Sequence, residues 1–433
     1  MHSGYEPHLW DGCSFHPTLY LDDVSEIPFL VNIAGVEEYQ HRAWVRAGEG
    51  DLVAAVTPLT RGYEEYCREN LRLGAPDLVL AEPRENLLAV AEACWHGKAF
   101  AKIVERARAG NGLLIHPYMS VEPVWELARR VSAAARVPVQ VLGPPPPVTW
   151  IANDKLRFSE LVEHVLGKER LVRTESARDP RTLAGHLLDI GRRYPRVGLK
   201  RTRCASAMGN AVFRSEELSS QEHTEALVRS FLERTEWDGR EEVLAVAWEE
   251  AEVSPSSQTW IPPTGKGEPT VEGIYEQILE GEEKIFVGSR PSTLAKTLNR
   301  RLTDASLRCA EALQELGYVG RCSFDLLVVD GEQIRFTECN GRWGGTSIPM
   351  SLVDRLVGRP RPPYRAQDVA HPGLVGAPFR DVLRAVGSDP RFVLYNVGPL
   401  AQWGKLDVIA FGASQPEAEE ALTDDLPRLL GVK

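Results

Sequence analysis

The chain has 433 residues, of which 43% are hydrophobic and 26% are charged, the balance of a soluble globular protein. This length exceeds one ordinary compact core and predicts two to four domains at ~100–200 residues each. No apolar run approaches the ~18 residues of a transmembrane helix, and the first thirty residues lack the basic start and apolar core of a signal peptide. The net charge of −11, without a basic block, argues against nucleic acid as the main partner.

Cysteine and lysine usage narrows the setting further. The seven cysteines are an odd number and form no CxxC pair, which argues against a disulfide framework and a ribbon-type zinc site. We therefore expect a cytoplasmic protein whose cysteines are mostly buried and inert. Only ten of the 50 basic residues are lysines, so a lysine at a chemically meaningful position merits attention.

The first third of the chain alternates short apolar runs with helical patterns. Alternation of this kind predicts a mostly parallel sheet with helices on its faces. No GxGxxG motif follows any of the expected strands, so a dinucleotide site has no support there. The runs that read as buried strands are 29–35, 51–58, 77–83, 112–118 and 137–143, and the helical stretches are 62–74, 84–97 and 121–135.

Four consecutive prolines at 144–147 favour a stiff, extended segment, and we place a domain boundary there. The predicted division is an α/β domain over 1–147, a central domain over 148–350 and an α+β region over 351–433. The central domain opens with a helix over 153–167, capped by Asn153 or Asp154. Further expected elements are a strand at 196–202, helices at 217–234 and 293–317, a strand pair within 392–412 and a closing helix from about Pro416.

A hairpin over 321–340 carries the clearest chemistry. Its two strands join at Asp330-Gly331, a strong hairpin signal. Glu338 and Asn340 share one face of the second strand, and Asp325 lies on the first strand near the same level. Two carboxylates and an amide oxygen suit Mg²⁺, which retains waters and commonly bridges nucleotide phosphates. The alternative is a solvated hairpin whose polar residues simply face outward.

Residues beside the hairpin add to this interpretation. Arg342 follows at the same two-residue spacing and offers a planar cation for a carboxylate or phosphate oxygen. Cys339 should point to the opposite face, into the core. Trp343 could pack or could form a platform for substrate. Two lysines also fit a phosphate site: Lys155 begins a helix, and Lys200 ends a strand before a loop of small residues at 201–210.

These pieces resemble an ATP-grasp ligase. The segments NDK, GLK before a small-residue loop, VLAVAW, GxxGRCSFDL and ECNGR occur in the order typical of that fold, over roughly 150–350. The whole chain is similar to the peptide-ligase subgroup that includes the ligase of pheganomycin biosynthesis, through SPSxQ, a YEQIL-like segment and ECNGRWGGTSIP. The resemblance implies a Rossmann-like pre-ATP-grasp domain, two α+β subdomains that clamp ATP, and a small C-terminal α+β segment.

The resemblance also implies individual roles. Lys155 and Lys200 match the lysines that hold the ATP phosphates, and Arg342 matches the arginine that steadies an acyl-phosphate. The flap over the phosphates matches Ser206, Met208, Gly209 and Asn210; the adenine hinge matches Ala247 and Trp248; the metal ligands match Asp325, Glu338 and Asn340. The cofactors so implied are ATP and Mg²⁺, with Mn²⁺ as a substitute.

Three positions depart from the pattern. Val246 replaces the common hinge glutamate, so Glu249 or Glu250 is the candidate substitute. The flap has few glycines. Ser323 stands where some relatives have arginine, which leaves Arg290 or Arg321 to contact the transferred phosphate, and we select Arg290 as the second catalytic candidate.

The expected activity is ADP-forming ligation of a small carboxylate to an amine or peptide acceptor through an acyl-phosphate, in natural-product metabolism. The alternatives are a small-molecule phosphotransferase and a non-catalytic ATP-binding regulatory protein. We expect no membrane partner, and a homodimer is compatible with the sequence.

Overall fold

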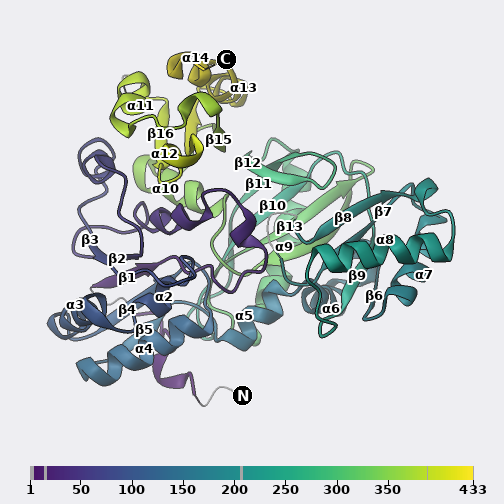
Figure 1. Ribbon diagram of the computed structural model, residues 1–433, viewed down its shortest axis with the longest axis horizontal. Helices are drawn as coiled ribbons and strands as arrows, with labels where there is room; N and C mark the ends of the chain where they lie inside the picture. Colours follow the sequence, from purple (N-terminus) through teal and green to yellow (C-terminus); the bar gives the residue numbers. More distant parts are fainter. Residues whose placement is uncertain (1–3, 14–16, 205–207, 388, 433) are drawn as a thin grey trace.

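The computed structural model describes residues 4–13, 17–204, 208–387 and 389–432. This part of the chain forms three β-sheets, and Figure 1 shows them side by side with helices on their outer faces. The parallel sheet lies at the lower left, the four-stranded sheet at the right, and the C-terminal elements at the top. No helix among the described residues combines the length and the apolar composition that crossing a bilayer requires.

The N-terminal sheet is parallel throughout and has the strand order β3-β2-β1-β4-β5. Its strands are β1 (Thr18–Leu21), β2 (Leu52–Ala55), β3 (Asp77–Leu80), β4 (Leu113–Pro117) and β5 (Val139–Val141). The main covering helices are α3 (Gly97–Ala109) and α4 (Glu122–Ala135), with short helices α1 (Tyr63–Glu65) and α2 (Val90–Ala93). Leu19, Ile103 and Trp125 belong to one buried core between sheet and helices. The α/β architecture expected for this region is therefore present.

Two local predictions in this sheet are wrong. The apolar run at 29–35 is not a strand, because Phe29 has a positive φ of 65° and the chain then turns through a 3-10 helix at Leu30–Asn32. Leu30 is nevertheless buried, since the segment covers the sheet as a loop. The central strand is instead β1, a four-residue stretch between Pro17 and Asp22 that is too short to stand out by pattern. The helical stretch at 84–97 contains only the one turn α2, and α3 follows it.

The second sheet is antiparallel, with the order β6-β9-β7-β8. Helices α7 and α8 pack on it through a buried core that includes Leu187, Val228 and Phe231. The elements are β6 (Thr174–Ala177), α7 (Pro180–Gly191), β7 (Arg196–Arg201), β8 (Asn210–Arg214), α8 (Gln221–Arg234) and β9 (Val243–Ala247).

Helices α5 (Pro146–Asn153) and α6 (Lys155–Leu166) lead into this sheet. The prediction of an extended segment over the four prolines therefore holds only for part of it. Pro145 is extended, whereas Pro146 is the first residue of α5, a position where the fixed φ of proline suits a helix. The predicted cap of α6 is Asp154, whose side chain accepts hydrogen bonds from the backbone N–H groups of Leu156 and Arg157.

The third sheet has eight strands in the order β14-β13-β10-β11-β12-β15-β17-β16. Its C-terminal strands continue the sheet of the central region, because β15 pairs with β12 through Gly288 and Ser289. The strands are β10 (Pro255–Ile261), β11 (Thr270–Glu280), β12 (Ile285–Pro291), β13 (Gly320–Val329), β14 (Gln333–Asn340), β15 (Tyr364–Ala370), β16 (Phe392–Asn396) and β17 (Lys405–Phe411). The helices around it are α9 (Lys296–Glu315), α10 (Ser347–Val357), α11 (Phe379–Val386), α12 (Leu400–Trp403), α13 (Gln415–Glu420) and α14 (Leu426–Leu430).

The predicted hairpin is confirmed as β13 and β14. Asp330 and Gly331 have φ values of 51° and 72°, the left-handed conformation that such a turn requires. The long helix expected at 293–317 is α9, which buries Leu302, Cys309 and Leu313 on one side. The strand pair within 392–412 is also confirmed, as the antiparallel pair β16 and β17.

Candidate functional site

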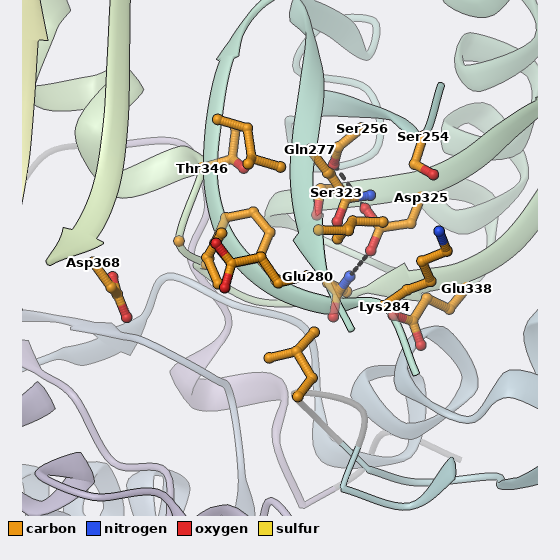
Figure 2. Close-up of a pocket in the computed structure, with 18 of the residues that line it drawn as sticks. Ser254, Ser256, Gln277, Glu280, Lys284, Ser323, Asp325, Glu338, Thr346 and Asp368 are labelled. Atoms are coloured by element: carbon orange, nitrogen blue, oxygen red, sulfur yellow. Dashed lines mark hydrogen bonds between the residues drawn. The ribbon is translucent and has the colours of Figure 1, made fainter. Parts of the chain in front are cut away.

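A cavity of about 1220 Å³ lies where the three sheets meet. Its wall includes Lys155 from α6, Lys200 from β7, and Asp325 and Glu338 from β13 and β14. Figure 2 shows Asp325 and Glu338 on one side of this cavity and Asp368, on β15, across it. Residues that are far apart in the sequence thus share one enclosed space, as expected of a binding site.

The hairpin register sets the positions of the three predicted metal ligands. Asp325 is paired directly with Glu338, and Ser323 is paired with Asn340, so the three polar side chains lie on one face. The Nδ2 group of Asn340 donates to Oδ2 of Asp325 at 2.9 Å, and Oγ of Ser256 donates to Oδ1 at 2.7 Å. Cys339 points to the other face and is buried against the aromatic core of Phe158 and Phe336, as predicted.

The two carboxylates have opposite electrostatic environments. Burial acts to raise the pKa of Glu338, but Lys155 and Lys200 outweigh it and lower that pKa to about 2. Nζ of Lys155 lies 2.8 Å from Oε2 of Glu338. Burial and the neighbouring charge of Glu338 raise the pKa of Asp325 to about 7. The nearby charge of Arg342 and the hydrogen bonds from Ser256 and Asn340 lower the pKa of Asp325 but do not offset burial and the repulsion by Glu338.

This donor set fits a hard divalent cation such as Mg²⁺. A divalent cation beside Asp325 would offset the burial and the repulsion by Glu338 that together raise its pKa, and carboxylate and amide oxygens are the ligands that Mg²⁺ prefers. Among the described residues there is no cluster of three or more His, Cys, Asp and Glu side chains suited to a metal. A cation held by Asp325, Glu338 and Asn340 would therefore depend on phosphate oxygens and water for its remaining ligands.

The two lysines converge on the same carboxylate from different elements. Lys155 is the first residue of α6, and its backbone N–H donates to the carbonyl oxygen of Thr202 at 2.9 Å, which joins the helix to the segment after β7. Nζ of Lys155 also donates to the carbonyl oxygen of Cys204 at 3.4 Å. Nζ of Lys200 lies 5.0 Å from the ring centre of Trp248. Burial and the charge of Lys155 lower the pKa of Lys200, so an anion beside both lysines would be stabilised.

Three of the four predicted flap residues, Met208, Gly209 and Asn210, are among the described residues. Ser206 lies outside the described residues. Met208 and Asn210 line the cavity, and Asn210 is paired with Lys200 in the β7–β8 hairpin. Gly209 faces Cys204 instead: a Cβ atom on Gly209 would lie 2.8 Å from Cβ of Cys204, so the close approach of these two residues between β7 and β8 requires glycine.

The predicted hinge residues lie at the end of β9. Ala247 and Trp248 both line the cavity, and the backbone N–H of Trp248 donates to the carbonyl oxygen of Arg196 at 3.0 Å. Of the two candidate substitutes for the hinge glutamate, Glu249 lines the cavity, and its Oε2 atom lies 3.8 Å from Nε of Arg335. Glu250 is exposed and does not contribute to the cavity wall.

Arg342 is held by a residue that sequence reasoning had not assigned. The NH1 group of Arg342 donates to Oδ1 of Asn153 at 2.9 Å, and the backbone N–H of Gly341 donates to the same oxygen at 3.1 Å. Nδ2 of Asn153 donates in turn to the carbonyl oxygens of Thr149 and Gly341. Asn153 is only 9% exposed, and its hydrogen bonds to the backbone hold its side chain in place, so it can fix the position of the Arg342 guanidinium. The NDK motif contained this residue, but only the fold shows what it contacts.

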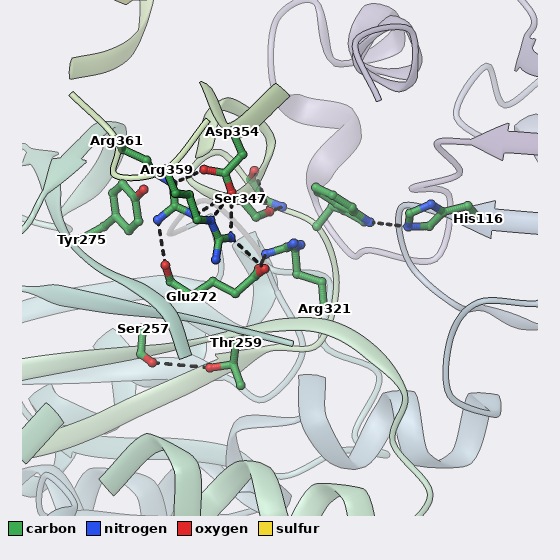
Figure 3. Close-up of polar contacts among 12 residues, drawn as sticks. His116, Ser257, Thr259, Glu272, Tyr275, Arg321, Ser347, Asp354, Arg359 and Arg361 are labelled. Carbon is green, nitrogen blue, oxygen red and sulfur yellow. Dashed lines mark hydrogen bonds and ion pairs between the residues drawn. The ribbon is translucent and has the colours of Figure 1, made fainter. Parts of the chain in front are cut away.

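Trp343 packs between two arginines. The guanidinium carbons of Arg46 and Arg321 lie 4.6 and 4.7 Å from its ring centre, and its Nε1 group donates to Nε2 of His116 at 3.2 Å (Figure 3). The ring is 6% exposed. Trp343 therefore joins the hairpin segment to the N-terminal sheet, and packing is its main role.

The two arginines considered for the transferred phosphate occupy different places. Arg290 lines the cavity, where its guanidinium donates to Oε2 of Glu276 at 2.8 Å and pairs with Glu419. Arg321 instead pairs with Glu272, in the polar group that Figure 3 shows beside Arg359. Arg290 is thus the better placed of the two, although both of its carboxylate partners already engage it.

Comparisons with known proteins bear on the fold. The model of the pre-ATP-grasp domain family matches residues 40–133. The solved structure of N5-carboxyaminoimidazole ribonucleotide synthetase from Thermus thermophilus is 18% identical with a TM-score of 0.55, covering 95% of this chain and 98% of its own. The chain has an ATP-grasp fold behind a pre-ATP-grasp domain.

Other structures of this fold contain nucleotides. Carboxyaminoimidazole ribonucleotide synthase from Aspergillus clavatus, complexed with ATP, is 14% identical with a TM-score of 0.57 and covers 96% of this chain and 98% of its own. Biotin carboxylase from Campylobacter jejuni, in a complex with a β-γ-ATP ligand, is 12% identical with a TM-score of 0.58, covering 94% and 89%. No curated protein matches the sequence. These likenesses establish the architecture, and the chemistry has to be argued from the cavity.

Proposed function

We propose that this protein is an ATP-dependent carboxylate–amine ligase that forms an amide or peptide bond through an acyl-phosphate and releases ADP. The observation that carries the proposal is the convergence of Lys155, Lys200, Asp325 and Glu338 in one cavity, with two cations facing two carboxylates. Such a set can hold the phosphates of a nucleotide together with a divalent cation. The neighbouring structures of the same fold that contain ATP or ADP support a nucleotide in this place.

The size of the cavity supports more than one bound molecule. Its volume of about 1220 Å³ exceeds the ~300–1,000 Å³ typical of a pocket for one small ligand. Asp325 and Glu338 occupy one part of its wall, and Asp368 lies on the far side (Figure 2). Lys155, Lys200 and Trp248 line the same cavity, and Nζ of Lys155 lies 2.8 Å from Oε2 of Glu338. We infer that ATP binds beside Lys155 and Lys200, and that the acid and the amine occupy the remaining space toward Arg290 and Arg342.

The residues of this chain would divide the work as follows. Lys155 and Lys200 bind phosphate oxygens, and Ala247 and Trp248 border the adenine. Asp325, Glu338 and Asn340 would hold Mg²⁺, which neutralises charge on the phosphates when bound. The substrate carboxylate attacks the γ-phosphorus, and ADP leaves. Arg342, held by Asn153, steadies the acyl-phosphate while the amine attacks its carbonyl carbon and phosphate departs.

The finer assignment is a peptide ligase of natural-product metabolism. It rests on the resemblance of ECNGRWGGTSIP, SPSxQ and NDK to the peptide-ligase subgroup. The phosphotransferase and the regulatory alternatives use the same nucleotide site, so an assay has to separate the three.

The test measures ADP release with a panel of carboxylic acids, each with and without an amine acceptor. We expect release to require both an acid and an amine, and hydroxylamine to trap the acyl-phosphate as a hydroxamate. A stable phosphorylated product without amine would establish the phosphotransferase, and ATP binding without turnover would establish the regulatory protein. Lys200→Ala and Glu338→Ala should abolish ATP consumption, and unchanged consumption in either would refute the site assignment.

A further inference from the structure

Asp22 occupies a special position in the pre-ATP-grasp domain. It follows directly after β1, at the carboxyl end of the central strand of the parallel sheet. The strand order β3-β2-β1-β4-β5 reverses direction between β1 and β4. Open parallel sheets bind ligands in the crevice outside the carboxyl ends of such a strand pair. Asp22, after β1, and Tyr118, after β4, both line the large cavity, so this crevice opens into the candidate site.

The carboxylate of Asp22 is incompletely partnered. Asp22 is 2% exposed, and one of its oxygens, Oδ1, pairs with Arg46. The other oxygen, Oδ2, is buried and has no hydrogen-bond partner among the described residues. Burial raises the pKa of Asp22 to about 6, despite the charges of Arg46 and Arg42. A buried carboxylate oxygen in a cavity wall without a donor is costly unless a ligand supplies one.

Two other cations near this end of the cavity have carboxylate partners of their own. Arg42, which also lines the cavity, is engaged by Asp407 at 2.7 Å and by Asp368 at 3.8 Å. Lys405 is engaged by Asp368 at 2.9 Å and by the hydroxyl of Tyr39 at 2.7 Å. Among the described residues, Arg46 is therefore the one cation paired with Asp22, and Oδ2 of Asp22 is left for a donor that a ligand can supply.

Two backbone hydrogen bonds connect the last residue of β1, which precedes Asp22, to the segment that contains Arg342. The N–H of Tyr118 donates to the carbonyl oxygen of Leu21 at 2.9 Å, and the N–H of Trp343 donates to that of Tyr118 at 3.0 Å. Trp343 follows Arg342, the residue proposed to steady the acyl-phosphate. The crevice at Asp22 therefore borders the segment beside which the amine has to arrive.

The segment that follows Asp22 contributes apolar side chains to the cavity. Val24, Ile27 and Leu30, on the segment that follows it, are largely buried and line the same cavity. We propose that Asp22 binds the ammonium group of the amine substrate, and that this substrate carries an apolar group, as in an amino acid or peptide with an aliphatic first side chain. This inference rests on the proposed ligase function and names the acceptor class.

The test is a binding measurement that does not depend on turnover. Isothermal titration calorimetry at pH 7.5 compares L-leucinamide with 4-methylpentanamide, which has the same apolar group and amide but no amine. The wild-type chain should bind leucinamide at least about tenfold more tightly, because a charge-assisted hydrogen bond forms only with the ammonium. Glycinamide, which keeps the ammonium, should bind about tenfold more weakly than leucinamide because it lacks the aliphatic group.

Variants locate the effect. Asp22→Asn should reduce the preference for leucinamide over 4-methylpentanamide to about twofold or less, whereas Glu280→Gln, an exposed carboxylate in the wall of the same cavity, should retain it. If Asp22→Asn does not fold, Asp22→Asn/Arg46→Gln replaces it, since that variant leaves no buried charge unpaired. If neither variant folds, the comparison of leucinamide with 4-methylpentanamide binding by the wild type decides whether the proposal holds.

Equal binding of the two amides by the wild type, a preserved preference in the Asp22 variant, or an equal loss in Glu280→Gln would each overturn the proposal. Equal binding of glycinamide and leucinamide would overturn its apolar part. The ligase function fails separately, through the absence of acid- and amine-dependent ADP release.

Discussion

Replacing Asn153 by alanine should slow catalysis without weakening ATP binding. The Oδ1 atom of Asn153 accepts hydrogen bonds from NH1 of Arg342 at 2.9 Å and from the N–H of Gly341 at 3.1 Å. Its Nδ2 group donates to the carbonyl oxygens of Thr149 at 2.8 Å and Gly341 at 3.3 Å. Asn153→Ala removes all four hydrogen bonds and leaves a buried N–H without a partner. No atom of Asn153 is proposed to touch the nucleotide, so its effect has to pass through Arg342.

The magnitude follows from the groups that lose a partner. An unsatisfied buried backbone donor costs about 1–3 kcal/mol, and each remaining hydrogen bond contributes about 1 kcal/mol. Arg342 faces the cavity and can be hydrated, so the loss of its hydrogen bond to Asn153 adds little to the cost in stability. We expect the folded state to be destabilised by about 3–5 kcal/mol in total. Freedom of the guanidinium to leave its position should lower kcat by about tenfold to a hundredfold.

The assay is steady-state ADP release with saturating acid and amine, combined with thermal unfolding followed by circular dichroism. KM for ATP should stay within about twofold of the wild-type value, since the lysines are untouched. The control is Gln314→Ala, which removes a side-chain amide that donates to the carbonyl oxygens of Pro262 and Gly267 away from the cavity. It should lower the melting temperature while leaving kcat unchanged. A raised KM for ATP with normal kcat in Asn153→Ala would refute the positioning role.

Three further results are expected. Lys200→Met should weaken binding of ATP at least about tenfold, measured by calorimetry, because a partly buried cation in the proposed phosphate site is lost. Lys266→Met, on an exposed loop, should leave the affinity for ATP unchanged. Trp343→Ala should destabilise the chain by about 3–5 kcal/mol in urea unfolding, because the ring fills the space between Arg46 and Arg321. A change under ~1 kcal/mol would show that the packing of this ring between the two arginines contributes little to stability. The folded-state pKa of Asp22 is about 6, above its unfolded value, so the folded protein holds this proton to a higher pH. Between about pH 4 and pH 8, the wild type should therefore lose about 3 kcal/mol of stability relative to Asp22→Asn. Parallel curves of stability against pH for the two proteins would contradict this.

Local chemistry explains which parts of the fold were predictable. The turn at Asp330-Gly331 needs two left-handed residues, and this requirement fixed both the hairpin and the shared face of Glu338 and Asn340. Asp154 was recognisable as a helix cap because its oxygen serves two nearby N–H groups. In each case the partners lie within a few residues along the chain, so the spacing of residue types was sufficient.

The failures arise where distant partners decide the conformation. The run at 29–35 is as apolar as a strand, but the positive φ of Phe29 and the packing of Leu30 on the sheet make it a covering loop. The strand β1 is only four residues long, and it is identified by its neighbours β2 and β4, not by its own pattern. Parallel strands are not joined by a short turn that would identify the partner strand in the sequence, so the sequence pattern alone could not identify β1.

The same distinction applies to the site. Asp325, Glu338 and Asn340 could be grouped from the sequence because they share a hairpin, and Lys155 and Lys200 were singled out by their positions at a helix start and a strand end before the resemblance was considered. The cavity brings Lys155, Lys200, Asp325, Glu338 and Asn340 together, and their roles stay predictions. Asn153 and Asp22 were not found, since their importance lies in contacts with residues that the sequence places far away.

The location of the cavity explains why one site draws on three sheets. The β13–β14 ladder holds Asp325 and Glu338 opposite each other, whereas Lys155 and Lys200 come from α6 and β7. Asp22, at the end of β1, lines the same cavity from the parallel sheet. Trp343 lies between Arg46, which pairs with Asp22, and Arg321 of β13, so it links the end of β1 to the segment that follows the hairpin. Contacts between the sheets, not within any one of them, therefore bring the proposed binding groups to one cavity.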